Sequence, residues 1–478
     1  MRVLLCTEGT YPYVGGGVST WCDILCHELE EVDFTLYAIT GAPEVRLRYE
    51  LPGNVDDLVH VPLWGIQEPA DYVLADVPGR ELRARRRRTT DAVVRERFLP
   101  LLDRLLAGIN GDPGESDGRV AHELWRFFGD HDWKRCWKSQ AAWDLFARRM
   151  GDGASIDDLT TCLGWLYNYL MPLAVPLPPA DLVHTTIAGF PGLAGVVAKH
   201  EHGTPFVITE HGVWVRERYI SISAAEAFSD YAKRFLMALS QLVARMNYAC
   251  ADWVSPVTDY NRRWELPYGV SPERIVTIRN GVDPALFVPK PKPEKTRGRP
   301  TVVAAARIFP LKDMETMIRS AAVARERIPE VHYLVYGSLD ADPPYVERCR
   351  ALIAELEVEQ TFELAGHHSK PAELFTEGDV SALSSISEAF PYTVIEAMAC
   401  ARPVIGTDVG GVAEALEGYG IVVAPRDHQA FGEAVVTLLR DDLLRVQLGR
   451  QAREAVLAHF RVSSSVNGYR DLYARAMN

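Results

Sequence analysis

The feature that most constrains the fold is an alternation of short apolar runs with longer amphipathic stretches, which occurs twice along the chain. Apolar runs rich in branched residues predict buried strands, and the stretches between them predict helices. In the first half, strands are expected over residues 3–6, 34–40, 181–186, 205–211, 253–257 and 274–278. In the second half, they are expected over residues 301–306, 331–336, 361–365, 380–384, 403–407 and 421–424. Such alternation favours parallel sheets with helices on both faces.

A stretch of prolines and charges without apolar periodicity separates the two halves. This composition is typical of a stiff linker, which we place at residues 289–300. The predicted architecture is α/β, with two doubly wound, Rossmann-like domains over residues 1–288 and 301–460 that face a cleft. A C-terminal helix over residues 461–478 can cross back to the first domain. Sheets of this kind bind ligands at the carboxyl ends of their strands, so we expect a site in the cleft.

The alternation is interrupted between residues 65 and 180, where the sequence is helical in pattern and rich in tryptophan. We expect a helical insertion in the first domain whose indoles fill its own core; the alternative is a platform for an acceptor or a partner. An arginine-rich run from Arg80 to Arg88 predicts a solvated helix face, or a patch for anionic lipid or polysaccharide. Residues 159–180 carry no charge, but their prolines favour a buried helix and connector over a membrane span.

Charge and cysteine content disfavour several functions. The chain has 64 Asp and Glu against 51 Lys and Arg, a net charge of −13, which disfavours binding to nucleic acid. Its 8 cysteines form no CxxC pair and show no zinc-like spacing, so reduced, buried thiols are expected. The N-terminus lacks the apolar run of a signal peptide. We therefore expect a cytoplasmic location, either free or peripheral at the inner face of the membrane.

A glycine-rich segment follows the first predicted strand. Gly16 and Gly17 precede the helix expected over residues 18–29, where glycines let the backbone approach a ligand and the helix N-terminus attracts an anion. The segment is not a G-x-G-x-x-G fingerprint, which disfavours a dinucleotide-dependent oxidoreductase. A glycine turn without any ligand would have the same sequence.

Two segments of the second half suggest a site for a diphosphate-linked sugar. Arg307 and Lys312 follow a predicted strand, and two cations on such a loop can grip two phosphates. Glu388 precedes a helix that we expect to include Pro391 in its first turn, and Glu396 lies within that helix. One carboxylate could accept sugar hydroxyls and the other could bridge the vicinal hydroxyls of a ribose, with the helix N-terminus facing a diphosphate. Taken alone, each segment could equally be an unrelated group of surface charges.

Together these residues carry a family resemblance. The chain resembles the retaining GT-B glycosyltransferases of family 4 at Arg307, Lys312, Glu388, Glu396 (the E-x7-E pattern), Gly410–Gly411 and Asn280–Asp283. Residues 8–21 and 209–218 are similar to those of the Pel-type exopolysaccharide glycosyltransferases, PelF and its relatives. The resemblance spans nearly the whole chain and is weakest over residues 65–180.

The resemblance implies a metal-independent hexosyltransferase without a cofactor. It would move a hexose or N-acetylhexosamine from a UDP-sugar to a polysaccharide or glycan acceptor. Catalytic roles would fall on Arg307, Lys312, Glu388 and His211. Contacts to the nucleotide sugar would come from Gly16, Gly17, His184, Asn280, Gly337, Phe390, Thr393 and Glu396. Membrane-associated synthase subunits are expected as further partners of the insertion, and nucleic acid is not.

The chain departs from that family at a histidine. Many relatives carry D-x-x-H-x-H after the middle strand, whereas Thr186 occupies the second histidine position here. We therefore expect His211, at the end of the next strand, nearest the reacting sugar, with His184 second; a histidine that only hydrogen-bonds backbone is the alternative. Asp340 and Asp342 form a D-x-D metal signature, but the cations already present make a required metal unnecessary.

Other functions stay open at this stage. One is a glycosyltransferase acting on a glycolipid or small molecule. A second is a nucleotide-sugar 2-epimerase of the same fold. A third is a non-catalytic assembly subunit that binds a nucleotide sugar.

Overall fold

The computed structural model describes residues 1–478, which divide into two compact units. The first unit comprises Met1–Pro256, Asn261–Thr277 and Tyr469–Asn478. The second comprises Val257–Tyr260 and Ile278–Gly468. Each unit is built around one six-stranded sheet. All paired strands run parallel, as the alternating pattern predicts.

The first sheet has the order β3-β2-β1-β4-β5-β6, so the order reverses between β1 and β4. Its strands are β1 (Arg2–Glu8), β2 (Asp33–Thr40), β3 (Val55–Pro62), β4 (Leu182–Thr185), β5 (Phe206–Glu210) and β6 (Trp253–Pro256). Sequence reasoning missed the edge strand β3, because Asp56 and Asp57 interrupt its apolar pattern on the exposed edge. It was wrong about a strand at 274–278, where only a single bridge joins Ile275 to Val254.

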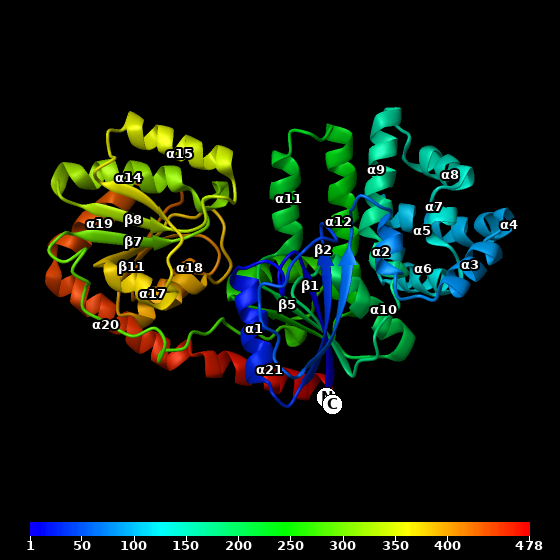
Figure 1. The fold of residues 1–478 in the computed structure, drawn as a ribbon, viewed down its shortest axis with the longest axis horizontal. Coiled ribbons are helices and arrows are strands. Elements are labelled where there is room, and N and C mark those ends of the chain that lie inside the picture. Colours follow the sequence, from blue (N-terminus) through cyan, green and yellow to red (C-terminus); the bar gives the residue numbers. More distant parts are fainter. The chain divides into compact units, whose positions relative to one another are not determined.

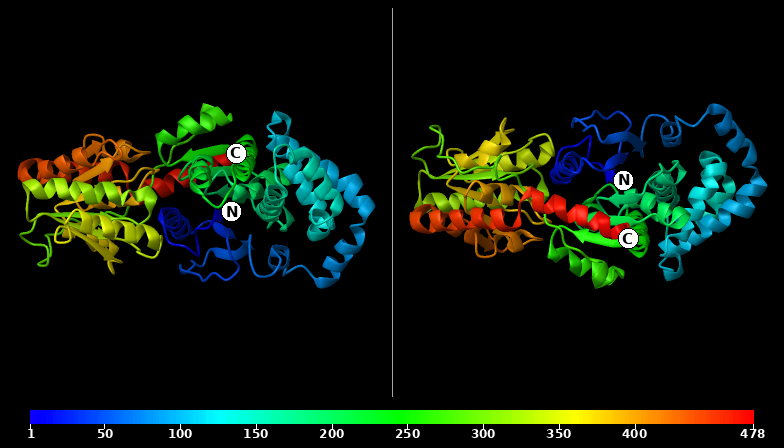
Figure 2. Two further views of the ribbon diagram at one scale, coloured as in Figure 1. Left: turned by 90° about the horizontal axis from the view of Figure 1, so that it is seen from above. Right: turned by 90° about the horizontal axis from the view of Figure 1, so that it is seen from below.

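Helices cover this sheet and extend from it (Figures 1 and 2). The helices outside the insertion are α1 (Gly17–Glu28), α10 (Leu193–His202), α11 (Trp214–Ala224), α12 (Asp230–Cys250) and α13 (Arg262–Glu265). Within residues 65–180 lie α2 (Pro69–Val73), α3 (Gly79–Arg88), α4 (Asp91–Val93), α5 (Leu99–Ile109), α6 (Arg119–Asp130), α7 (Trp133–Trp137), α8 (Gln140–Met150) and α9 (Ile156–Tyr169). The insertion is therefore helical, as its sequence pattern predicts.

The core of the insertion is continuous with the core of the first sheet. One hydrophobic cluster includes Val183 of β4, Leu239 of α12 and Leu102 of α5. Trp133 and Trp137 are buried within it, at 2% and 3% exposure. The prediction that the indoles fill a core holds for Trp133 and Trp137, but this core is not confined to the insertion, because the insertion packs on α10 and α12 and adds to one larger core. No helix of the chain combines the length and apolar character that a membrane crossing requires.

The second sheet has the order β12-β11-β10-β7-β8-β9, with its reversal between β10 and β7. Its strands are β7 (Thr301–Ala305), β8 (His332–Tyr336), β9 (Phe362–Gly366), β10 (Val380–Leu383), β11 (Val404–Thr407) and β12 (Ile421–Val423). The helices are α14 (Met314–Arg327), α15 (Pro343–Glu355), α16 (Pro371–Leu374), α17 (Tyr392–Ala399), α18 (Val412–Leu416), α19 (His428–Arg440) and α20 (Asp442–His459). In Figure 1, α14 and α15 cover one face of this sheet, and α17 lies on the other.

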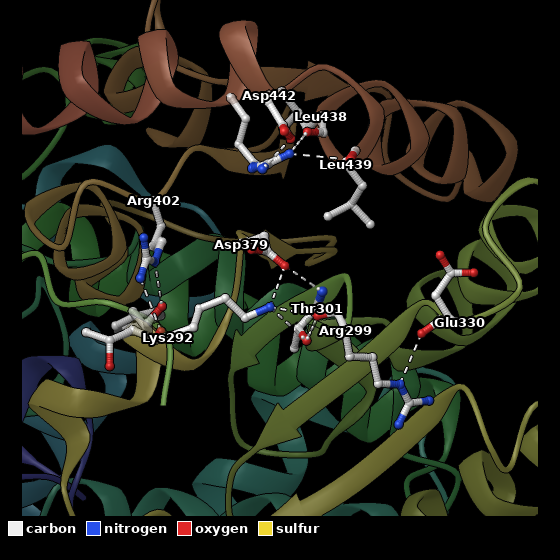
Figure 3. A network of polar contacts seen from close by, with 12 residues as sticks. Lys292, Arg299, Thr301, Glu330, Asp379, Arg402, Leu438, Leu439 and Asp442 are labelled. Atoms are coloured by element: carbon white, nitrogen blue, oxygen red, sulfur yellow. Dashed lines mark hydrogen bonds and ion pairs between the residues drawn. The ribbon is translucent and has the colours of Figure 1, made fainter. Parts of the chain in front are cut away.

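The proline-rich linker is bonded to the second unit (Figure 3). Lys292 Nζ lies 2.7 Å from Asp379 Oδ2, and the same oxygen accepts the backbone N–H of Thr301 at 2.8 Å. Arg299 Nε donates to the carbonyl of Glu330 at 3.0 Å. These bonds fix the path by which the chain enters β7.

The C-terminal helix α21 (Val462–Ala476) contributes its last residues to the first unit. Tyr469 and Tyr473 are each 1% exposed there. Arg470 Nε donates to Glu31 Oε1 at 2.6 Å.

Candidate functional site

A cationic loop follows β7 at the carboxyl edge of the second sheet. Arg307 is exposed, with its guanidinium carbon 5.2 Å from the ring centroid of Phe309. Lys312 ends a short 3₁₀ turn, and Asp313 then takes a left-handed conformation with φ 45°. The Asp313 carboxylate accepts the hydroxyl of Thr316 at 2.7 Å and caps α14. This cap holds the end of the loop at which Lys312 stands.

The loop after β10 meets this cationic loop directly. The Lys312 ammonium bonds to Glu388 Oε1, and the side chains are only 19% and 10% exposed. Ser385 Oγ donates to the same carboxylate oxygen at 2.6 Å. Ser384 Oγ donates to the carbonyl of Lys312 at 2.9 Å, which joins the two loops. The pair therefore lies where the strand order reverses, the place where open α/β sheets bind ligands.

Glycines allow the neighbouring loops to approach this pair. A Cβ on Gly410, which has φ 56°, would lie 1.9 Å from the carbonyl oxygen of Glu388. The backbone N–H of Gly411 donates to the carbonyl of Ala389 at 2.6 Å. A Cβ on Gly337 would lie 1.7 Å from the carbonyl oxygen of Ala306. Gly337 thus serves the packing of the loop after β8 against the cationic loop.

Helix α17 begins one residue later than the sequence suggests. Pro391 is the N-cap, with φ −74° and ψ 128°, so it precedes the first turn and was wrongly placed within it. Phe390 is 3% exposed, and its carbonyl accepts Asn280 Nδ2 at 2.8 Å. Asn280 is itself 4% exposed. These two buried residues hold the start of the helix, and the half-exposed Thr393 lies in its first turn.

Glu396 lies on α17, and its carboxyl forms no hydrogen bond within the chain. Part of its side chain reaches the surface, but protein packs densely around the carboxyl. Burial raises its pKa from 4.5 to about 7. An unpaired carboxyl in this state can accept or donate a hydrogen bond to a ligand hydroxyl near neutral pH.

His184 and His211 both lie in the first unit but differ in their hydrogen-bond partners. His184 is 0% exposed, with Nδ1 2.7 Å from the Tyr473 hydroxyl and Nε2 2.7 Å from Thr209 Oγ1. His211 is 8% exposed, and its Nε2 has no hydrogen-bond partner. Burial lowers the pKa of each to about 3, and for His184 the neighbouring His211 adds to the effect. Both rings are therefore neutral at physiological pH.

These contacts correct the expectation for His184. Both of its ring nitrogens are already bonded inside the core, so neither is available to a nucleotide sugar. His211 keeps a free nitrogen, and its part in the reaction stays a prediction. Trp21 packs edge-on against it, with ring centroids 4.7 Å apart.

The glycine segment of the first unit leads into α1 at the carboxyl end of β1. Gly16 is the N-cap of α1 and Gly17 its first residue, and both are exposed. The space where a Cβ of Gly16 would stand is open. The first N–H groups of a helix have no partner within the helix and can serve an anion.

No three His, Cys, Asp or Glu side chains of the chain come together in an arrangement that could hold a metal ion. Asp342 of the D-x-D sequence caps α15 by accepting the N–H of Tyr345 at 3.0 Å. All 8 cysteines are free and buried.

Two family models match the chain. Residues 1–273 match a family described as a domain of unknown function (DUF3492), which covers more than half of the chain. The chain belongs to the DUF3492 family. Residues 289–455 match the glycosyl transferases group 1, so the second unit is a domain of that family.

Individual relatives extend the similarity. The D-inositol 3-phosphate glycosyltransferase of Pseudarthrobacter chlorophenolicus is 26% identical over 278 residues, which are 55% of this chain and 63% of the relative. The chain thus spans less than two thirds of that protein. These matches do not bear on the resemblance to the PelF family, which stays a prediction.

Two solved structures share the fold of the DUF3492 chain. Sucrose-phosphate synthase from Thermosynechococcus elongatus has a TM-score of 0.63 at 18% identity, over 99% of this chain and 98% of that one. Anabaena HepE in complex with UDP-glucose has a TM-score of 0.60 at 15% identity, over 99% and 100%. At such identities the likeness shows the fold alone, which is the predicted GT-B fold.

Glu8 begins the 8–21 segment that carries part of the family resemblance, but sequence reasoning assigned it no role of its own. Glu8, at the end of β1, has a buried carboxylate oxygen without a partner, and burial raises its pKa to about 7 although Arg218 acts in the opposite direction. Arg218 Nη2 donates to the Tyr169 hydroxyl at 3.0 Å, and its guanidinium carbon lies 5.4 Å from that ring's centroid. The signal in the sequence that could have identified it is the position of Glu8 at the end of the first predicted strand, before the glycine-rich loop.

Proposed function

We propose that this chain is a retaining glycosyltransferase that moves a hexose or N-acetylhexosamine from a UDP-sugar to a polysaccharide or glycan acceptor, in exopolysaccharide synthesis of the Pel type. The observation that carries the proposal is the contact of Lys312 with Glu388 at the strand-order reversal of the second unit. A cation and a carboxylate held together there can bind the diphosphate and the sugar hydroxyls of one donor. Support for UDP comes from the shared fold of Anabaena HepE, a protein solved with UDP and with UDP-glucose.

The proposed chemistry places charge stabilisation on the cationic loop. When the bond between the anomeric carbon and the diphosphate breaks, negative charge builds on the leaving oxygen, and Arg307 and Lys312 stabilise it. The acceptor oxygen forms the new bond on the same face of the sugar, and its proton passes to the departing phosphate. Glu396 would bind the ribose and Glu388 the donor sugar. We expect this transfer to need no metal and no cofactor, because the two cations supply the positive charge.

Donor binding and turnover test the proposal separately. UDP and UDP-sugars should raise the melting temperature of the chain, because a ligand of the folded state stabilises it. Lys312→Ala should remove most of this shift and most of the release of UDP from a UDP-sugar. The exposed control Arg327→Ala should change neither, since Arg327 pairs only with Glu433 on the surface. A chain that no uridine nucleotide stabilises would overturn the proposal, and turnover that EDTA abolishes would overturn its metal-independent form.

A small-molecule acceptor is the second candidate. It is favoured by the relative that carries the name D-inositol 3-phosphate glycosyltransferase. Supplying inositol phosphates and glycan oligomers in parallel, with the same radiolabelled donor, separates the two by which acceptor takes up the label. UDP binding without hydrolysis or transfer to any acceptor would instead identify a non-catalytic assembly subunit.

We further propose that the enzyme acts in the cytoplasm at the inner face of the membrane, with synthase subunits bound through residues 65–180. The exposed arginines of α3 support such an anionic or protein contact. Cofractionation with membranes that is lost on replacing Arg83, Arg86 and Arg87 by Ser would test it.

A further inference from the structure

A groove opens on the helical insertion, among residues that neither the sequence motifs nor the donor site includes. Its cavity measures ≈ 580 Å³, a size usual for ligand sites. The segment before α2 forms one wall, and α7, α8 and α9 provide the rest. All of these elements belong to the first unit.

A balanced pair of charges lies in this groove. The Tyr167 hydroxyl donates to Glu68 Oε2 at 2.9 Å, and the Lys138 ammonium bonds to Glu68 Oε1. Burial acts to raise the pKa of Glu68, but the hydrogen bonds from Lys138 and Tyr167 outweigh it and hold this pKa below its usual range. The Glu68 carboxylate therefore stays ionised, and its negative charge balances the positive charge of Lys138. A strongly anionic or cationic ligand gains little from such a lining.

Apolar surface lies beside these polar groups. The indole of Trp143 is half-buried and stacks on no other ring of the chain. Ile66 is 95% exposed at the rim. The space where a Cβ of Gly164 would stand is open. An unstacked indole beside open space offers a flat face to a ligand with apolar C–H groups.

Neutral hydrogen-bonding groups complete the lining. The half-buried amide of Asn168 makes no hydrogen bond within the chain, and Gln67 is exposed nearby. A lipid tail would leave these amides without partners, at a cost in free energy. A ligand with hydroxyl groups at its edge and C–H groups on its face would satisfy both kinds of surface.

A second cavity of ≈ 300 Å³ adjoins the groove. The two cavities share Lys138, Ser139 and Gln140 as lining residues. The two adjoining cavities together offer room for several linked rings, and Arg95 and Arg135 line the second one.

We propose that this groove binds a neutral oligosaccharide, with one sugar ring packed on Trp143 and its hydroxyls bonded to Asn168 and Glu68. The site would hold a segment of the acceptor glycan through residues of the insertion that take no part in binding the donor. The identification of the ligand as an acceptor rests on the proposed function, whereas the binding itself does not require turnover.

Titration of the full chain with oligosaccharides of increasing length tests the proposal. The probes are N-acetylglucosamine and its linear oligomers, followed by tryptophan fluorescence and calorimetry. Oligomers should bind more tightly than the monomer, and Trp143→Ala should weaken oligomer binding by about tenfold. Asn168→Ala should weaken it as well, without risk to folding, since its amide has no partner in the chain.

A matched pair of exposed isoleucines provides the control. Ile66→Ala, in the groove, should weaken binding, whereas Ile156→Ala should not, although Ile156 is also exposed at 78% and lies on α9 outside the lining. UDP should stabilise all four variants equally. Saturable oligomer binding that every groove variant retains would overturn the proposal, as would the absence of any binding to the unaltered chain.

Two further outcomes separate this inference from others. An unaltered chain that binds oligosaccharides but not UDP would overturn the proposed function and leave this inference standing. A dimer in sedimentation that Ile66→Ala dissociates would show that a second copy of the chain fills the groove, which would overturn the saccharide assignment.

Discussion

Replacing Glu388 by Gln tests how the donor site holds its charge. In the structure the Lys312 ammonium is bonded to the Glu388 carboxylate, and both side chains are largely covered. A diphosphate must compete with that carboxylate for Lys312. Glutamine keeps the size of the side chain and can still accept the hydroxyl of Ser385, but it carries no charge. We therefore expect Glu388→Gln to bind UDP more tightly while it transfers sugar more slowly.

The size of the effect follows from the bond that is released. A hydrogen bond to a charged group contributes about 1.5–3 kcal/mol, and the remaining exposure of the pair places the net gain near the lower value. The Kd for UDP should then fall by about tenfold in calorimetry at low salt. Lys312→Ala should move it in the opposite direction, by about tenfold or more. Opposite signs in two variants of one ion pair would be hard to obtain from a general loss of structure.

An ion pair of the same unit serves as the control. Arg327 and Glu433 are paired 3.2 Å apart at 51% and 43% exposure, so Glu433→Gln should leave the Kd for UDP unchanged. If Glu388→Gln weakened UDP binding as much as Lys312→Ala does, the carboxylate would be a support for the loop and not a competitor. That result would refute the reasoning.

Three other perturbations have outcomes set by local structure. A Cβ on Gly410 would lie 1.9 Å from the carbonyl oxygen of Glu388, so Gly410→Ala should lower the free energy of unfolding by about 1–3 kcal/mol, measured in urea. Burial raises the pKa of Glu396 from 4.5 to about 7, so the folded chain keeps a proton that the unfolded chain has lost, and stability should fall as the pH rises through this window. Glu396→Gln should remove this pH dependence, which amounts to at most about 3 kcal/mol in the free energy of unfolding across the window. Burial lowers the pKa of His184 and His211 from 6.5 to about 3, so stability should fall as the pH drops through that range, and His211→Gln should flatten this decline in thermal melts. The assigned causes would be contradicted if Gly410→Ala kept the urea midpoint of the unaltered chain. They would also be contradicted if Glu396→Gln kept its loss of stability near neutral pH, or if His211→Gln kept its loss of stability in acid.

Much of the fold could be predicted because its central strands are buried on both faces. All six strands of the second sheet were predicted, since each contains a short apolar run between clear helices. The edge strand β3 was not, because one side of it faces solvent and carries charge. The alternation of apolar and amphipathic segments also does not predict the order of the strands in each sheet. Lys312 and Glu388 stand 76 residues apart, and only the adjacency of β7 and β10 brings them into contact.

The candidate site shows a more general limit, because a sequence reveals which residues are polar but not which of them already have partners. His184 and His211 look equivalent as polar residues at neighbouring strand ends. The difference arises from Tyr473, which is 289 residues from His184 in the chain and occupies its Nδ1. No similar partner reaches Nε2 of His211 or the carboxyl of Glu396. A polar group that stays unpaired in a dense environment costs free energy unless a ligand or water meets it. The groups that remain candidates for substrate contact are therefore those whose partners the fold does not supply.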